Sequence, residues 1–435
     1  MSGERRLGVV RGAALYVGAL IGPGVLLVPA LAAQAAGPAS IVAWAGLLVL
    51  SAPLAITFAA LGVRHPVAGG VTAYVRAGLG ELAAAVTGVW FMTAILLGGP
   101  AVSLIGGYYV ADLTGGGTRV AVAVGLAMLG AVLAANAFGL RVSSGFQLFL
   151  SAVLVVVIAI AVGVALPSRG GHNWTPFAPH GWWAVGDAAS ILIWLFIGWE
   201  AMAQLAGEFR RPERDLPRAM ALAFGVVAVL YVGLGVATIA VTASGGSKVP
   251  LADLVGVGFG RAGRDATAVL AVALTMGTMN VYMGGSAKLA SALAQEGTLP
   301  RWLAGDTHRS IPRRPLVVLA LTGSLALLAL GAGLSNAADL VRATSACFVA
   351  VYLLSLASAV RILTGRLRLC AIVSVALVAV VAVFSEAFLL VPIGAALVAL
   401  TAAGARSRRS APPRRERVRD ALQRRSELGE VTQQQ

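Results

Sequence analysis

The sequence predicts an all-α polytopic membrane protein, and three observations point to this fold class. Hydrophobic residues make up 58% of the 435 residues and charged residues only 12%, whereas a soluble domain needs a much larger polar share. The apolar residues come in long blocks, which indicates spanning helices rather than the alternating strands of a membrane β-barrel. Two of these blocks are interrupted mid-membrane, a pattern typical of secondary transporters.

The chain is expected to cross the membrane about twelve times, because a spanning helix needs about 20 mainly apolar residues. Blocks of this kind lie at 9–34, 39–63, 82–111, 118–138, 143–166, 186–206, 218–243, 266–293, 315–333, 338–361, 368–384 and 386–404. Only Ser385 and Glu386 separate the last two blocks. We therefore expect a single transmembrane domain over residues 1–404 and a basic tail over residues 405–435.

Arginine residues gather in alternate loops, and this bias predicts the orientation. With the N-terminus in the cytosol, the cytoplasmic loops hold far more arginine than the opposite loops, as the positive-inside rule requires. Nine arginines lie between Arg406 and Arg425. Next to a membrane, this tail is expected to contact anionic lipid head groups rather than nucleic acid. Both termini are therefore expected in the cytoplasm.

The sequence offers little for catalysis or metal binding. Cys347 and Cys370 fall inside apolar blocks, and the four histidines lie in loops without a third ligand at useful spacing. The sequence contains no HExxH, GxSxG or P-loop motif. A membrane enzyme and a channel are the alternative classes, but neither a nucleophile–base pair nor a filter-like loop supports them. We expect no cofactor, no metal and no enzymatic activity.

The first apolar block is interrupted near its middle. Pro23 lies between Gly22 and Gly24. Proline removes a backbone donor and glycine adds backbone freedom. Within lipid, the freed backbone groups must find partners or face a polar cavity. On this segment alone, a simple kink and a true break both remain open.

The sixth block carries a matching interruption. Gly198 lies mid-span and Glu200 follows it; a carboxyl group at that depth usually faces a cavity or a partner. Span six comes five spans after span one, and an odd offset means that the two helices cross the membrane in opposite directions. The two interruptions therefore occupy equivalent places in two inverted halves. We expect these halves at about 9–166 and 186–361, with peripheral helices at about 368–404.

Two broken helices provide the chemistry for binding an amino acid. A half-helix that begins inside the membrane directs free N–H groups and its positive dipole end into the cavity, where a carboxylate binds. Unwound carbonyl groups accept hydrogen bonds from an ammonium group. The two interruptions together predict a clamp for the main-chain groups of an α-amino acid.

The residues from Phe196 onward carry a specific family pattern. A Phe-x-Gly-x-Glu core precedes a Glu-x-x-x-Pro-x-x-Asp-x-Pro-x-Ala loop, here Phe196, Gly198, Glu200, Glu208, Pro212, Asp215, Pro217 and Ala219. With the Gly22-Pro23-Gly24-Val25 segment, this pattern resembles the amino acid–polyamine–organocation (APC) superfamily over nearly the whole chain. The phrases WEAMAQLAGEFRRPERDLPRA and HPVAGGVTAYV most resemble bacterial L-methionine/branched-chain amino acid exporters.

The resemblance implies a LeuT-like fold, a 5+5 inverted repeat with discontinuous helices 1 and 6 and two peripheral helices. It implies a secondary active transporter of a bacterial-type plasma (inner) membrane. Such a transporter exports neutral hydrophobic amino acids by alternating access, driven by proton antiport or exchange. An APC-type importer or exchanger of different specificity is the alternative. The expected partners are a neutral amino acid and membrane lipid, and the protein is expected to be a monomer or a homodimer.

The resemblance also implies substrate contacts in the two interrupted helices. The segment that holds the substrate carboxylate comprises Ile21, Gly22, Pro23 and Gly24. Pro23 departs from the Ser or Thr often found at this place, and it withholds a hydroxyl and an N–H from the carboxylate. The segment that receives the amino group comprises Phe196, Ile197 and Gly198, and Trp194 matches a gating aromatic residue.

Three further residues are expected near the substrate on span eight, namely Met276, Met279 and Asn280, with Trp90 of span three in the same region. The methionines could form a soft substrate pocket or simply pack, since both uses show helical spacing. Glu200 also has two interpretations. It could carry a coupling proton, or it could cap the free N–H groups of the broken helix.

Overall fold

Helices account for all regular secondary structure in the part of the chain that the structure describes. The computed structural model describes residues 7–64, 70–140, 142–168, 171–200, 208–242, 246–305 and 311–410. The α-helices of the first half are α1 (Val9–Leu20), α2 (Val28–Ala36), α3 (Ser40–Arg64), α4 (Gly70–Leu79), α5 (Glu81–Leu113), α6 (Thr118–Ala137) and α7 (Ser144–Ala165). Those that follow are α8 (Ala184–Leu192), α10 (Pro212–Thr242), α11 (Pro250–Gln295), α12 (Arg313–Gly331), α13 (Ala337–Ile362), α14 (Gly365–Val383) and α15 (Leu390–Ser410).

Nine helical stretches among the described residues are long and apolar enough to cross a membrane. The shorter apolar helices Val9–Leu20, Ala184–Phe196 and Glu386–Thr401 correspond to the expected spans one, six and twelve. Spans one and six are short because the chain leaves the helical conformation in the middle of each. The predicted fold class, an all-α polytopic membrane protein with discontinuous spans one and six, is confirmed.

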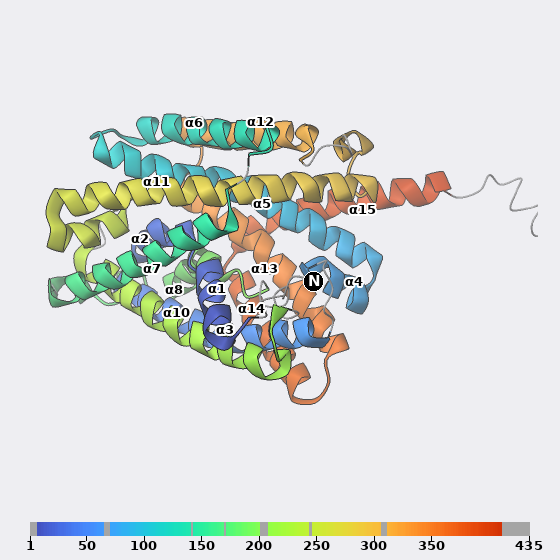
Figure 1. Cartoon of the computed structure of the whole chain (residues 1–435), viewed down its shortest axis with the longest axis horizontal. Helices are drawn as coiled ribbons and strands as arrows, with labels where there is room; N and C mark the ends of the chain where they lie inside the picture. Colours follow the sequence, from blue (N-terminus) through green and yellow to red (C-terminus); the bar gives the residue numbers. More distant parts are fainter. Residues whose placement is uncertain are drawn as a thin grey trace, which may run out of the picture.

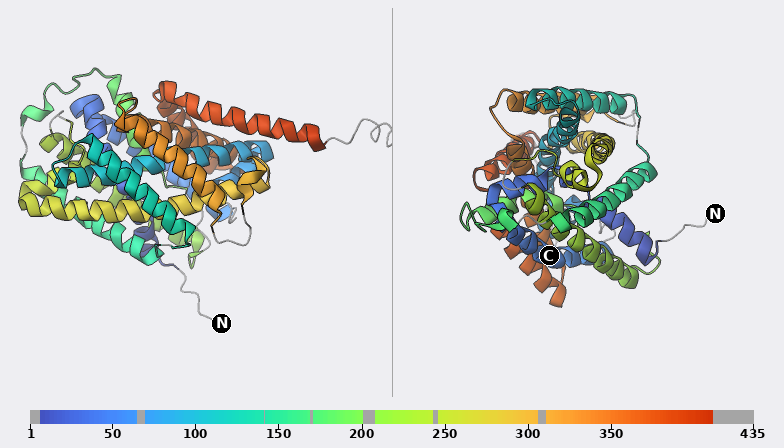
Figure 2. Two further views of the ribbon diagram at one scale, coloured as in Figure 1. Left: turned by 90° about the horizontal axis from the view of Figure 1, so that it is seen from above. Right: turned by 90° about the vertical axis from the view of Figure 1, so that its left-hand side faces the viewer.

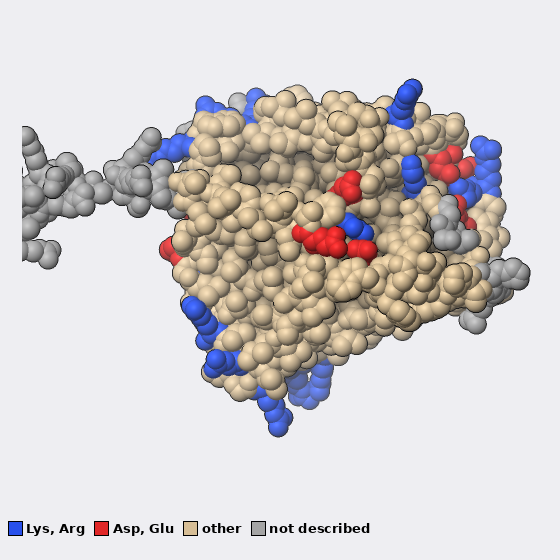
Figure 3. Space-filling model, turned by 180° about the vertical axis from the view of Figure 1, so that it is seen from behind, with Lys and Arg blue, Asp and Glu red and all other residues tan. Residues whose placement is uncertain are grey.

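The helices α5 and α11 lie at the centre of the bundle and pack extensively against each other (Figure 1). α6 and α12 pack together along one side, and α1 pairs with α10 on another (Figures 1 and 2). α2 packs against α8, which brings the two interrupted spans together. The face in Figure 3 is mostly uncharged, with many of its lysines and arginines near the margins. Exposed apolar side chains such as Val156 and Leu325 suit contact with lipid.

The same order of elements occurs in both halves of the chain. In the first half, the short helix α4 precedes the long helix α5, and Gly80 joins them at a positive φ of 89°. In the second half, residues 250–259 form the corresponding short helix, and Gly260 (φ 55°) separates it from the rest of α11. Only glycine adopts such angles without strain. The repeated bend agrees with two halves of five spans.

Glycines on α5 allow its neighbours to approach closely. A Cβ atom at Gly107 would lie 2.1 Å from the backbone oxygen of Ala121 on α6, and one at Gly99 would lie 2.0 Å from Cε of Met283 on α11. Small residues at such contacts are typical of membrane helix packing. They allow α5 to lie directly against α6 and α11.

Candidate functional site

The first break begins where α1 ends. Ile21 (ψ 88°) and Gly22 (φ −106°, ψ −173°) leave the helical conformation, and a 3₁₀ turn, η1 (Pro23–Leu26), follows before α2 begins at Val28. The first N–H groups of a helix have no intrahelical partner. Pro23, which has no N–H, therefore costs η1 no hydrogen bond at this position. The segment is a true break rather than a kink.

The second break follows η5 (Ile193–Phe196), the last turn of the helix that α8 begins. Ile197 is extended, and Gly198 has a φ of 127°. The Gly198 N–H lies 3.0 Å from Oε2 of Glu200 and 3.0 Å from the Tyr352 hydroxyl. The Tyr352 hydroxyl donates to the same carboxylate oxygen at 2.5 Å. Glu200 therefore has the geometry of a cap for the break, while residues 201–207, which follow it, lie outside the described residues.

One tyrosine joins the two breaks. Tyr231 on α10 is fully buried, and its hydroxyl lies within donating distance of the Leu20 and Leu195 carbonyl oxygens, at 3.0 and 2.9 Å. Both carbonyls lie at the ends of half-helices, where intrahelical donors run out, and the Leu20 carbonyl also accepts from the Gly22 N–H at 3.1 Å. Trp44 and Phe196 pack edge-on against the Tyr231 ring. The hydroxyl thus satisfies backbone groups that both breaks release.

Replacing Tyr231 by phenylalanine tests this link. The ring and its packing remain, but the Leu195 carbonyl loses its donor and the Leu20 carbonyl keeps only the Gly22 N–H, so we expect the free energy of unfolding to fall by about 1–3 kcal/mol. Thermal unfolding of the detergent-purified protein measures the change. Tyr74→Phe is the matched control, because Tyr74 is also buried and its hydroxyl has no partner among the described residues. Equal melting temperatures for the two variants would show that the link is dispensable.

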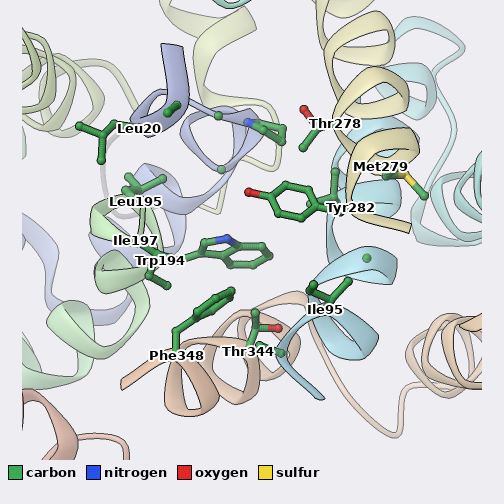
Figure 4. A pocket seen from close by; sticks show the side chains of 18 residues that line it. Leu20, Ile95, Trp194, Leu195, Ile197, Thr278, Met279, Tyr282, Thr344 and Phe348 are labelled. Carbon is green, nitrogen blue, oxygen red and sulfur yellow. The ribbon is translucent and has the colours of Figure 1, made fainter. Parts of the chain in front are cut away.

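A cavity of about 80 Å³ lies between the two breaks (Figure 4). The interrupted spans line it with Ala19, Leu20, Gly22, Pro23, Gly24, Trp194, Leu195 and Ile197. The remaining walls come from α5, α11 and α13, with Ala94, Ile95, Gly98, Gly99, Val102, Thr278, Met279, Tyr282, Thr344 and Phe348. Figure 4 shows the rings of Trp194 and Tyr282 projecting into the cavity from opposite walls.

The described part of the cavity wall is largely apolar. None of the described residues that line it is a lysine, arginine, aspartate or glutamate. Hydroxyl groups of Thr278, Tyr282 and Thr344, the Trp194 indole and the backbone of the two breaks supply its polar groups. Such a space suits a small ligand with a charged main chain, held by backbone dipoles, and an apolar side chain. In the described residues, no group of three or more His, Cys, Asp and Glu is arranged to hold a metal ion.

The structure brings together six of the residues expected near the substrate. Cavity-lining positions are held by Gly22, Pro23, Gly24, Trp194, Ile197 and Met279. Ile21 and Phe196 are buried beside the cavity without lining it, and Gly198 lies against Ala19 and Leu20.

Met276 and Asn280 lie elsewhere, in a second pocket formed by α6, α7 and α11. Asn280 is engaged there with the α6–α7 loop, donating to the Leu140 carbonyl (3.2 Å) and accepting from the Val142 N–H (3.1 Å). Trp90 donates to the Pro392 carbonyl at 2.6 Å, between α5 and α15. Since a helix turns about 100° per residue, positions 276 and 280 cannot share the face of 278 and 282.

The sequence reasoning missed Thr278, Tyr282 and Phe348. Thr278 and Tyr282 are four residues apart on α11, which places them on one face. That spacing was a usable signal, because both carry a hydroxyl in a largely apolar helix. The Thr278 hydroxyl accepts a hydrogen bond from the Gln147 side chain at 3.0 Å, so α7 fixes its position in the wall.

Comparison with known families agrees with a transport site between broken helices. The family described as "Amino acid permease" matches residues 7–405. The chain belongs to this family of amino acid permeases. The match spans both breaks and every wall of the cavity, and the family is one of membrane transporters.

Curated relatives of the permease cover most of its length. An uncharacterized amino acid permease of Bacillus subtilis, YecA, is 32% identical over 83% of this chain and 86% of its own. The L-methionine/branched-chain amino acid exporter YjeH of Escherichia coli is 30% identical over 86% of this chain and 90% of its own. The branched-chain amino acid permease BcaP of B. subtilis is 28% identical over 68% of each chain.

Proposed function

We propose that this permease exports neutral hydrophobic amino acids, with L-methionine and the branched-chain amino acids as substrates. The observation that carries the proposal is the uncharged, largely apolar cavity between two breaks that offer backbone donors and acceptors. A charged side chain would meet no counter-charge there and would lose its hydration. The similarity to YjeH, an exporter by name, supports both the substrate class and the direction.

The proposed pose uses the two breaks for the main-chain groups. The carboxylate lies at Gly22–Gly24, where η1 and α2 present the positive end of a helix dipole. The ammonium group lies at the carbonyls of Ile197 and Gly198, where the chain is unwound. The side chain extends toward Ile95, Val102 and Phe348, whose apolar surfaces favour branched or thioether groups.

Export proceeds by alternating access and is driven by proton antiport or by exchange. The permease lies in a bacterial inner membrane with both termini in the cytoplasm, as the arginine distribution predicts.

Counterflow in proteoliposomes tests the proposal. Vesicles loaded with unlabelled L-methionine should take up labelled L-methionine with saturation, and leucine, isoleucine and valine should compete while lysine and glutamate should not. In cells, expression should lower cytosolic methionine and raise resistance to toxic methionine analogues. Counterflow together with a rise in cytosolic methionine would favour an importer. Absence of flux for every neutral amino acid would overturn the proposal.

A further inference from the structure

A groove on the outside of the bundle lies behind the central cavity. α6 and α7 both pack on α11 and diverge from each other on either side of it (Figure 2). The groove between them measures about 360 Å³ and is lined by Ala131, Val132, Ala135, Leu140, Val142, Phe146, Ala273, Met276, Gly277 and Asn280. Along α11, from Ala273 to Asn280, it extends about 10 Å at 1.5 Å per residue.

The walls of this groove leave little for water to bind. Asn280 is the only residue with a polar side chain among the described residues that line it. Its amide nitrogen and oxygen are both engaged, with the Leu140 carbonyl and the Val142 N–H. A stable buried water needs two to four polar partners. An empty groove would forfeit dispersion contacts along its walls, so a hydrocarbon chain is the occupant that fits.

One end of the groove is marked by an unmatched positive charge. Arg313, the first residue of α12, is exposed and donates to the Ala137 carbonyl, at the end of α6, at 3.4 Å. No ion pair of Arg313 occurs within the described ranges. Trp302, which is exposed and accepts a hydrogen bond from Arg314 through its carbonyl, lies nearby in sequence. Tryptophan and arginine together are typical of a helix end at the membrane–water interface.

We propose that this groove binds one anionic phospholipid of the surrounding bilayer. One acyl chain lies between α6 and α7 on the floor formed by α11, and the phosphate group pairs with Arg313. The acyl chain alone gives little selectivity, because bilayer lipid is as apolar as the groove. The head group therefore decides which lipid is retained.

Lipid binding to the full-length protein tests the proposal without relying on transport. The protein is purified from vesicles of phosphatidylcholine with phosphatidylglycerol, and native mass spectrometry measures the lipid retained. The wild type should retain phosphatidylglycerol in preference to phosphatidylcholine. Arg313→Gln should weaken this preference about fivefold, the effect of one surface cation. Arg314→Gln is the matched control and should resemble the wild type, because its guanidinium donates to the Trp302 carbonyl and not to the end of α6 beside the groove.

A second pair of variants tests the groove itself. Ala135→Trp fills it, whereas Ala134→Trp adds the same bulk at an exposed position on α6 that does not line it. Loss of phosphatidylglycerol from Ala135→Trp alone is the expected result. Equal retention by both tryptophan variants, or equal retention of the two lipids by the wild type, would overturn the proposal.

Discussion

Replacing Gly198 by alanine is expected to slow transport about 100-fold, because the break in span six depends on its backbone conformation. Gly198 has a φ of 127°, which L-residues rarely adopt. The added Cβ would lie 3.3 Å from Cδ2 of Leu20 and 3.4 Å from the Ala19 carbonyl oxygen. These contacts are tight but tolerable, so backbone strain dominates. To relieve it, the chain must rotate the N–H that Glu200 and Tyr352 hold.

One glycine substitution serves as the control for Gly198→Ala. Gly225→Ala on α10 places its Cβ in open space, and Gly225 does not have a positive φ. This variant should keep near-normal counterflow. Gly22→Leu should fail for a different reason, since its side chain would enter the cavity. Full activity of Gly198→Ala in correctly folded protein would contradict the requirement for a break at this position.

The spans and their interruptions could be predicted because each depends on local composition. Apolar blocks of sufficient length mark the helices, and Gly22-Pro23-Gly24 and Gly198 mark the breaks. The predicted edges at 118–138 and 143–166 agree closely with α6 and α7. The bends at Gly80 and Gly260 were missed, since an isolated glycine gives little indication of its φ angle.

The walls of the site were harder to predict because they depend on helix rotation. α11 is apolar on most faces, so the hydroxyl groups of Thr278 and Tyr282 are the main sign in its sequence of the face that meets the cavity. Met276 and Asn280 were expected there and lie on another face, while Thr278 and Tyr282 line the cavity. Tyr231 illustrates a second limit, because its partners at Leu20 and Leu195 are distant in the sequence and become neighbours only through the fold.

Glu200→Ala is expected to slow transport by about 10- to 100-fold. This factor corresponds to the free energy lost when a buried hydrogen-bond acceptor is removed. Its carboxylate accepts from both the Gly198 N–H and the Tyr352 hydroxyl, so alanine leaves two donors without this partner. Glu200→Gln retains a carbonyl oxygen in the same place and should keep transport within about threefold of the wild type. Initial rates of L-methionine counterflow measure both variants. Tyr352→Phe keeps the bond between Glu200 and Gly198 and should fall between them.

The glutamine variant also separates a cap from a proton carrier. Glutamine can accept the Gly198 N–H but cannot release a proton to the other side of the membrane. If Glu200 acts as a cap, an imposed pH gradient should change methionine flux in Glu200→Gln as much as it does in the wild type. If Glu200 carries the coupling proton, counterflow should persist while the response to the gradient disappears. The geometry favours the first outcome, because Oε2 of Glu200 already accepts from both a backbone amide and a tyrosine hydroxyl, which is the arrangement of a cap.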